Sequence, residues 1–123
     1  MYELRVEGEF SSSHQLREYE GKCENLHGHN WRVEMFVQGE TLNRIGLLVD
    51  FKILRTVLKD ILETLDHQFI NDIAPFNEIN PSAENIAKYL YDEAKEKLAD
   101  YPVKVSRINV YETNKSLASY FEG

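Results

Sequence analysis

Residues 2–14 alternate between mostly apolar side chains at even positions and polar side chains at odd positions, of which Glu3, Arg5, Glu7 and Glu9 are charged. A period of two predicts a strand with one buried face. Residues 27–37 repeat the alternation and predict a second strand, while the polar residues 15–26 predict a long hairpin loop between the two. The predicted inward-facing sets are Tyr2, Leu4, Val6, Phe10, Ser12 and His14 in the first strand, and His27, His29, Trp31, Val33, Met35 and Val37 in the second.

After residue 50 the hydrophobic period changes to that of a helix. Asp50 is placed to act as the N-cap of a first helix that begins at Phe51. A second helix is predicted to begin near residue 80, with Asn80 as its N-cap and Pro81 in its first helical position.

The C-terminal residues predict two more strands, 103–113 and 116–121, joined by a tight turn at Asn114 and Lys115. The order of elements is therefore ββααββ. This order predicts one α+β domain over residues 1–123, with two helices on one face of an antiparallel sheet.

Composition narrows the class of protein. No run of apolar residues is long enough for a membrane span, and the N-terminus has no apolar signal segment. A formal charge of −7 argues against a nucleic-acid surface. The single cysteine, Cys23, excludes an internal disulfide and fits a reducing cytoplasm, so we expect a cytoplasmic protein.

Three of the four histidines share the inward parity. His27 and His29 are two residues apart on one strand face, and His14 ends the inward set of the first strand. If the two strands pair as a hairpin, the three imidazoles meet at one end of the sheet. Three imidazoles without a fourth obvious ligand are typical of a catalytic zinc site. Two alternatives stay open at this point: ordinary polar residues at a strand end, and iron(II) or another divalent metal.

Three further residues, Asp66, His67 and Cys23, have side chains suited to catalysis, but each also has an ordinary structural explanation. Asp66 and His67 could form a dyad in which the carboxylate orients the ring, or a capping acid beside a helix-end histidine. Cys23 could be a buried small residue, or a thiolate if it lies near a metal.

Glu112 follows two inward apolar residues of its strand and is expected to point toward the apolar side. A buried carboxylate requires a partner. Two partners for the Glu112 carboxylate are equally suitable: the paired N–H groups of a heterocyclic ligand, or a nearby lysine or arginine.

Several motifs together resemble the 6-pyruvoyl-tetrahydropterin synthase and 6-carboxytetrahydropterin synthase family. In order they are FSSSH, CENLHGHNW, GLLVDF, LDHQFIN, NPSAENIA and VYET, and the C-x-x-x-H-G-H element is the most specific of them. The resemblance extends over nearly the whole chain. It implies the tunnelling fold (T-fold), in which three subunits join their sheets into a trimeric barrel, two trimers stack into a homohexamer, and the active sites lie between subunits.

The resemblance also implies roles for matching positions. It implies one Zn²⁺ per subunit held by His14, His27 and His29, with Cys23 as the catalytic base and Asp66 and His67 as its partner dyad. It further implies that Glu112 and Thr113 bind the pterin edge. Ser82 would be a second pterin contact, although a helix-start hydroxyl explains this serine equally well.

The compact C-x-x-x-H-G-H spacing is more similar to the bacterial enzymes of the family. Those convert 7,8-dihydroneopterin triphosphate to 6-carboxy-5,6,7,8-tetrahydropterin, acetaldehyde and triphosphate, on the route to queuosine. Glu24, directly after Cys23, introduces an alternative. A branch of the family uses a glutamate here to make 6-hydroxymethyl-7,8-dihydropterin for folate synthesis, and a chain with both residues could do both.

Two non-enzymatic alternatives remain. A pterin-binding module would keep the fold without the chemistry, and a structural protein would bind metal only for stability. The intact residue set argues against the first, and the missing fourth ligand argues against the second. The triphosphate also requires basic side chains near the pocket mouth, and the candidates are Arg17, Lys22, Lys52, Arg107 and Lys115.

Overall fold

The computed structural model describes residues 1–19 and 25–123. Its elements follow the predicted order, with one short addition. The order is β1 (Tyr2–His14), β2 (His27–Gly39), α1 (Phe51–Glu63), the 3-10 helix η1 (Ile70–Asp72), α2 (Ala83–Lys97), β3 (Lys104–Thr113) and β4 (Ser116–Tyr120). The α+β class and the ββααββ order are thereby confirmed.

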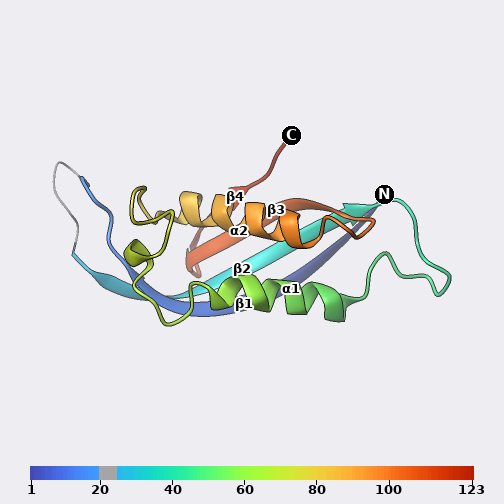
Figure 1. The fold of residues 1–123 in the computed structure, drawn as a ribbon, viewed down its shortest axis with the longest axis horizontal. Coiled ribbons are helices and arrows are strands. Elements are labelled where there is room, and N and C mark those ends of the chain that lie inside the picture. Colours follow the sequence, from blue (N-terminus) through green and yellow to red (C-terminus); the bar gives the residue numbers. More distant parts are fainter. Residues whose placement is uncertain (20–24) are drawn as a thin grey trace.

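The four strands form one antiparallel sheet in the order β1-β2-β3-β4. The β1–β2 hairpin is long and regular, and its register runs from Tyr2 opposite Gly39 to His14 opposite His27. Figure 1 shows this hairpin extending beyond the helices at the end of the molecule where η1 lies and α2 begins. The sheet therefore carries the ends of β1 and β2 into a region that the helices do not fully cover.

The core lies between the inward face of the sheet and the two helices. Trp31 of β2 is fully buried, and Phe10 of β1 stacks beside it with the ring centroids 5.7 Å apart. Leu54 and Leu58 of α1 and Leu90 of α2 complete the contact from the helix side. The predicted inward parity of β1 and β2 agrees with this burial.

The two helix starts had different outcomes. Asp50 caps α1 as predicted, because its Oδ1 accepts a hydrogen bond from the Lys52 amide. The prediction for the second helix is wrong by two residues: Ser82, not Asn80, is the N-cap, and its hydroxyl accepts from the Asn85 amide at 3.1 Å. Asn80 cannot cap α2 because its side chain is engaged elsewhere, as described below.

Strand β3 contains two irregularities. The pairing with β2 shifts between Phe36 and Val37, and the pairing with β4 shifts between Tyr111 and Thr113. The second shift falls at Glu112. Bulges of this kind re-aim a side chain at the end of a ladder. In the part of the chain that the structure describes, no helix is long and apolar enough to cross a membrane.

Candidate metal centre

The three inward histidines meet at the end of the β1–β2 hairpin. The register places His14 opposite His27 and Ser12 opposite His29. The ring centroids lie 4.5 Å apart for His14 and His27, 4.6 Å for His27 and His29, and 5.2 Å for His14 and His29. The expectation that the hairpin gathers the imidazoles is met.

Two backbone carbonyls fix the rings of this cluster. The Nδ1 atom of His14 lies 2.8 Å from the Pro81 carbonyl oxygen, and Nδ1 of His27 lies 2.9 Å from the Asn25 carbonyl oxygen. A carbonyl only accepts, so Nδ1 carries the proton in each ring and Nε2 keeps its lone pair. This is how proteins orient metal-binding histidines.

The cluster passes a second test for a metal. His14 is 2% exposed, and its buried Nε2 makes no hydrogen bond to any described residue. A buried nitrogen lone pair without a donor is costly in an apolar setting. The floor is indeed apolar, since the Trp31 ring lies 4.9 Å from His14 and 5.2 Å from His29, centroid to centroid. The donor set therefore fits a divalent cation such as zinc.

Glu112 completes the cluster from β3. Its Oε1 atom lies 3.0 Å from Nε2 of His29, 3.7 Å from that of His14 and 3.8 Å from that of His27. One ligand atom from each of the four residues lies within 4.8 Å of the others. The expected direction of Glu112 toward the inward face agrees with this position. The group it meets there, however, is a histidine cluster, not a lysine or arginine.

Asp66 and His67 form the expected dyad. Nδ1 of His67 lies 2.9 Å from Oδ2 of Asp66, and Oδ1 of Asp66 accepts a hydrogen bond from the Ser11 amide at 2.9 Å. The hydrogen bond from Ser11 and the one from His67 hold the pKa of Asp66 below its ordinary value. The carboxylate is therefore ionised and oriented at neutral pH.

The dyad lies outside the histidine cluster. The His67 side chain is 82% exposed, and its backbone has a positive φ of 56°, held by a bond from its amide to the Ser11 carbonyl. Asp66 and His67 contact each other and Ser11, whereas Glu112 contacts the three histidines. The dyad and the histidine cluster thus lie against different described residues.

The remaining predicted site residues are Cys23, Glu24, Ser82 and Thr113. Cys23 and Glu24 lie outside the described residues. Ser82 has the helix-start role described above. Thr113 is exposed at the β3–β4 turn, and its Oγ1 accepts from the Lys115 amide at 3.2 Å.

A cavity of about 370 Å³ borders the cluster on the side of β4 and the start of α2. Glu112 lines it together with a second carboxylate, Glu84, in the first turn of α2. Sequence reasoning did not select Glu84. Its place within the NPSAENIA motif, residues 80–87, was the available signal. The other lining residues are Ala83, Ser116, Leu117, Ala118 and Ser119.

Comparisons with known proteins agree with this architecture. Residues 3–123 match the family model described as 6-pyruvoyl tetrahydropterin synthase. The chain belongs to the 6-pyruvoyl tetrahydropterin synthase family. The Synechocystis 6-carboxy-5,6,7,8-tetrahydropterin synthase is 32% identical over 98% of this chain and 94% of that protein. The human 6-pyruvoyl tetrahydrobiopterin synthase is 31% identical over 94% of this chain and 81% of its own.

Solved structures show the same fold. The Caenorhabditis elegans 6-pyruvoyl tetrahydropterin synthase superposes with a TM-score of 0.87 at 24% identity, over 99% of this chain and 96% of the other. The Plasmodium vivax protein of the same name gives 0.81 at 23% identity, over 98% and 97%. The T-fold expected from the motifs is thereby confirmed for the chain.

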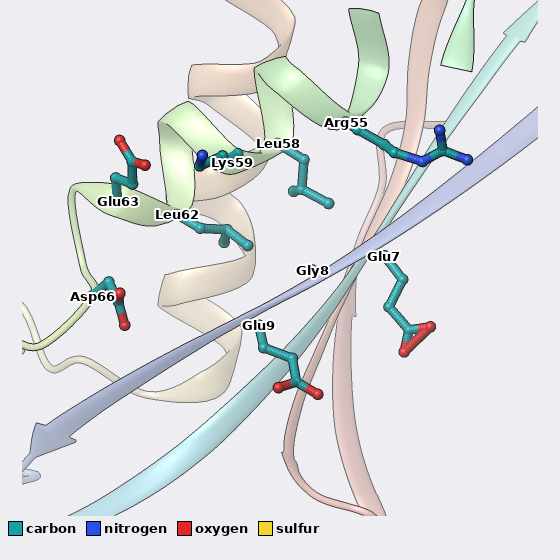
Figure 2. Close-up of a pocket in the computed structure, with 9 residues that line it drawn as sticks. All are labelled: Glu7, Gly8, Glu9, Arg55, Leu58, Lys59, Leu62, Glu63 and Asp66. Carbon is teal, nitrogen blue, oxygen red and sulfur yellow. The ribbon is translucent and has the colours of Figure 1, made fainter. Parts of the chain in front are cut away.

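A second cavity of this family domain, of about 240 Å³, lies between β1 and α1. Figure 2 shows Leu58 and Leu62 pointing from α1 toward Gly8 of β1, with Asp66 near one end of the cavity. The remaining lining side chains are charged and of both signs: Glu7, Glu9, Glu63, Arg55 and Lys59. Its residues include one member of the dyad and none of the histidine cluster.

A polar clamp fixes the chain just after His14. The Asn71 side chain accepts from the Gln15 amide at 2.9 Å and donates to the Gln15 carbonyl at 2.7 Å. Asn80 makes the same reciprocal pair with Arg17, at 2.7 and 2.9 Å. Each side-chain carboxamide thus pairs with the N–H and C=O of one backbone residue, as a neighbouring strand would. This engagement explains why Asn80 does not cap α2.

Arg17 itself has a structural role in this clamp. Its guanidinium donates to the backbone carbonyls of Ile79, Asn71 and Phe76, at 3.1, 3.3 and 2.5 Å. The structure thus employs Arg17 in holding the 71–80 segment. The expectation that it serves a triphosphate at the pocket mouth finds no support in these contacts.

Proposed function

We propose that this chain is a zinc-dependent 6-carboxytetrahydropterin synthase, a carbon-carbon lyase. It would convert 7,8-dihydroneopterin triphosphate to 6-carboxy-5,6,7,8-tetrahydropterin, acetaldehyde and triphosphate, on the route to queuosine. The observation that carries the proposal is the cluster of His14, His27 and His29, with two rings oriented by carbonyls so that their Nε2 atoms can bind a metal. The Synechocystis, Aquifex and Haemophilus relatives that carry this enzyme name support the assignment.

The three histidines would hold one zinc ion per subunit. When bound, zinc supplies Lewis-acid polarisation of the substrate's side-chain oxygens. The chain's own residues then move the protons. Asp66 keeps Nδ1 of His67 protonated, so Nε2 of His67 is the atom that exchanges a proton with the substrate. Cys23 would take the complementary proton as a thiolate.

The pterin would lie in the cavity of about 370 Å³ beside the cluster. In this proposed pose the side chain of the substrate would lie near the three histidines, and the heterocycle would lie against the wall lined by Glu84 and Glu112. Glu112 and Thr113 are proposed contacts of the amino-pyrimidinone edge, and Ser82 a further one. Carboxylates suit this edge, because its N–H groups are donors that a paired acceptor can satisfy.

The proposed working form is a homohexamer, a dimer of trimers. Strands β1 and β4 are the outer strands of the sheet, and among the described residues each pairs with one neighbouring strand. Such edges favour pairing with another copy. A site between subunits would also give the exposed His67 a partner. No nucleic-acid or membrane role is proposed.

The test is a product assay. Zinc-loaded protein is incubated with 7,8-dihydroneopterin triphosphate, and the pterins are separated for wild type, Cys23→Ala and Glu24→Ala. We expect 6-carboxytetrahydropterin and acetaldehyde from wild type, and their loss with Cys23→Ala. A zinc-bound protein that forms neither product would overturn the lyase and leave the non-catalytic pterin-binding module.

The same assay decides a second candidate. Glu24 directly follows Cys23, and a solved variant of the Plasmodium vivax protein replaces a glutamate described as its catalytic residue. A product 6-hydroxymethyl-7,8-dihydropterin that disappears with Glu24→Ala would make the protein bifunctional, or a folate-route enzyme.

A further inference from the structure

The end of β1 and the residues just before α2 are joined by two separate links. The Asn80 side chain accepts a hydrogen bond from the Arg17 amide at 2.7 Å and donates to the Arg17 carbonyl at 2.9 Å. The next residue, Pro81, offers its carbonyl oxygen to Nδ1 of His14, at 2.8 Å. Residues 14 and 17 therefore contact adjacent residues of one remote segment, and the two links together form a closed ring.

The Pro81 carbonyl is suited to bind a side chain because it lies outside the hydrogen bonds of α2. Ser82 is the N-cap, and its carbonyl accepts the bond from the Ile86 amide that begins the helix. Pro81 precedes the cap by one residue. Both Pro81 and the His14 ring are buried, so the contact between them is formed away from solvent. The direction of this carbonyl therefore depends on what holds Pro81 in place.

Arg17 and Asn80 hold Pro81 from the side of the 71–80 segment. The Arg17 guanidinium donates to backbone carbonyls within residues 71–79, which draws this segment against the end of β1. The Asn80 carbonyl accepts from the Asn85 side chain at 2.9 Å, which joins the clamp to the first turn of α2. Pro81 is thus fixed between two anchored neighbours.

We propose that Asn80 and Arg17 are positioning residues for His14, because they hold the Pro81 carbonyl where it keeps the imidazole proton on Nδ1. The nitrogen that carries the proton in a neutral imidazole is set by the hydrogen bond of the ring. Nε2 of His14, which lies 3.7 Å from Oε1 of Glu112 within the cluster, then keeps its lone pair. This role deepens the proposed function, and its effect on zinc binding rests on that function.

His27 provides a comparison within the same cluster. Its Nδ1 atom lies 2.9 Å from the carbonyl oxygen of Asn25, which is two residues away along the chain. This local contact involves neither Asn80 nor Arg17. Loss of the clamp should therefore change the ring of His14 and leave that of His27 as it is, whereas a general loosening of the fold would change both.

The first test requires no metal. Metal-free wild type, Asn80→Ala and the control Asn77→Ala, an exposed residue of the same segment, are labelled in their histidine rings and compared by NMR. At about pH 9 an ordinary imidazole is neutral, and the spectrum shows which ring nitrogen carries the proton. We expect His14 to be protonated on Nδ1 in wild type and Asn77→Ala, and to shift toward Nε2 in Asn80→Ala, with His27 unchanged in all three.

The second test titrates the same proteins with zinc against a chelator. We expect Asn80→Ala to bind zinc about 10-fold more weakly than wild type, and Asn77→Ala to bind it equally well. Asn80→Asp keeps the oxygen that accepts from Arg17 and lacks the donor to its carbonyl, so its affinity should be intermediate. Arg17→Lys, whose single ammonium cannot replace the fork of the guanidinium, should also weaken binding. These two variants supply the comparison if Asn80→Ala does not fold.

The outcomes separate this role from the proposed function. A wild-type His14 protonated on Nε2, or clamp variants in which His14 stays protonated on Nδ1, would overturn the positioning role. Equal changes at His14 and His27 would also overturn it, because general loosening explains them. A selective change at His14 with unchanged zinc affinity would overturn its bearing on the metal centre. A selective change at His14 in a protein whose wild type binds no zinc would overturn the proposed function and leave the positioning role standing.

Discussion

At the scale of single residues, Asp66 links pH to stability. Its pKa is lowered in the folded protein by the hydrogen bonds from the Ser11 amide and from His67. A lowered pKa stabilises the folded state above the unfolded value of about 3.9, and this contribution is lost as the pH falls through the folded pKa. The charge of Asp66 thus stabilises the protein at neutral pH and not in strong acid.

We therefore predict that Asp66→Asn makes the free energy of unfolding depend less on pH in the acid range. Asparagine keeps an oxygen for the Ser11 amide, so the variant removes chiefly the charge. Urea unfolding of metal-free protein at pH 7 and pH 3 measures the effect. The free energy of unfolding of wild type should exceed that of the variant at pH 7, and this difference should be smaller at pH 3. A difference equal at both pH values would contradict the assigned cause.

Ser82 is the second residue for which the structure separates two roles. Its hydroxyl caps α2 through the Asn85 amide. Removing an N-cap hydroxyl costs about 1 kcal/mol. We predict that Ser82→Ala lowers the free energy of unfolding by about this amount, and that Ser82→Thr restores it. A Ser82→Ala variant of wild-type stability, with weakened substrate binding alone, would instead support the pterin contact.

At the scale of elements, the clamp between residues 15–17 and 71–80 sets where β1 ends. Asn71 and Asn80 each make two hydrogen bonds to one backbone residue. Leaving a partly buried backbone pair unsatisfied costs about 1–3 kcal/mol. The clamp also adjoins the carbonyl of Pro81 that orients His14.

We predict that Asn80→Ala destabilises the protein by about 1–3 kcal/mol and increases amide exchange at Arg17. The exposed Asn77, in the same segment, provides the matched control Asn77→Ala. Denaturant unfolding and hydrogen exchange measure both. If the two variants behave alike, the reciprocal pair does not hold this segment.

The elements also show how far sequence reasoning reaches. The strands and the histidine cluster could be predicted because a period of two and a hairpin register are local properties, and they place His14 opposite His27. The N-cap of α2 could not be predicted, because the Asn80 side chain is hydrogen-bonded to the backbone of Arg17, which is 63 positions away along the chain. The inward direction of Glu112 could be predicted from the same alternation, but its approach to all three Nε2 atoms could not, because that depends on how β3 pairs with β2, a segment far away in the sequence.

At the scale of the whole molecule, the separation of the dyad from the histidine cluster is the main constraint on mechanism. His67 follows α1, is 82% exposed and donates its amide to Ser11 of the outer strand β1. His14, His27 and His29 instead meet Glu112 of β3. A single chain thus presents two parts of the proposed chemistry in different places. Assembly through the strand edges would allow one copy to supply the dyad and another the metal centre.

This arrangement predicts complementation between two inactive variants. Cys23→Ala and His67→Ala should each be inactive alone, but mixed assemblies should regain activity, because some sites combine an intact Cys23 from one copy with an intact His67 from another. Random mixing at equal amounts restores about a quarter of the sites. The measurement is product formation after co-refolding, with light scattering to confirm a mass of six chains of 14.4 kDa. A mixture as inactive as its components, in assemblies of that mass, would place the whole proton-transfer set within one chain.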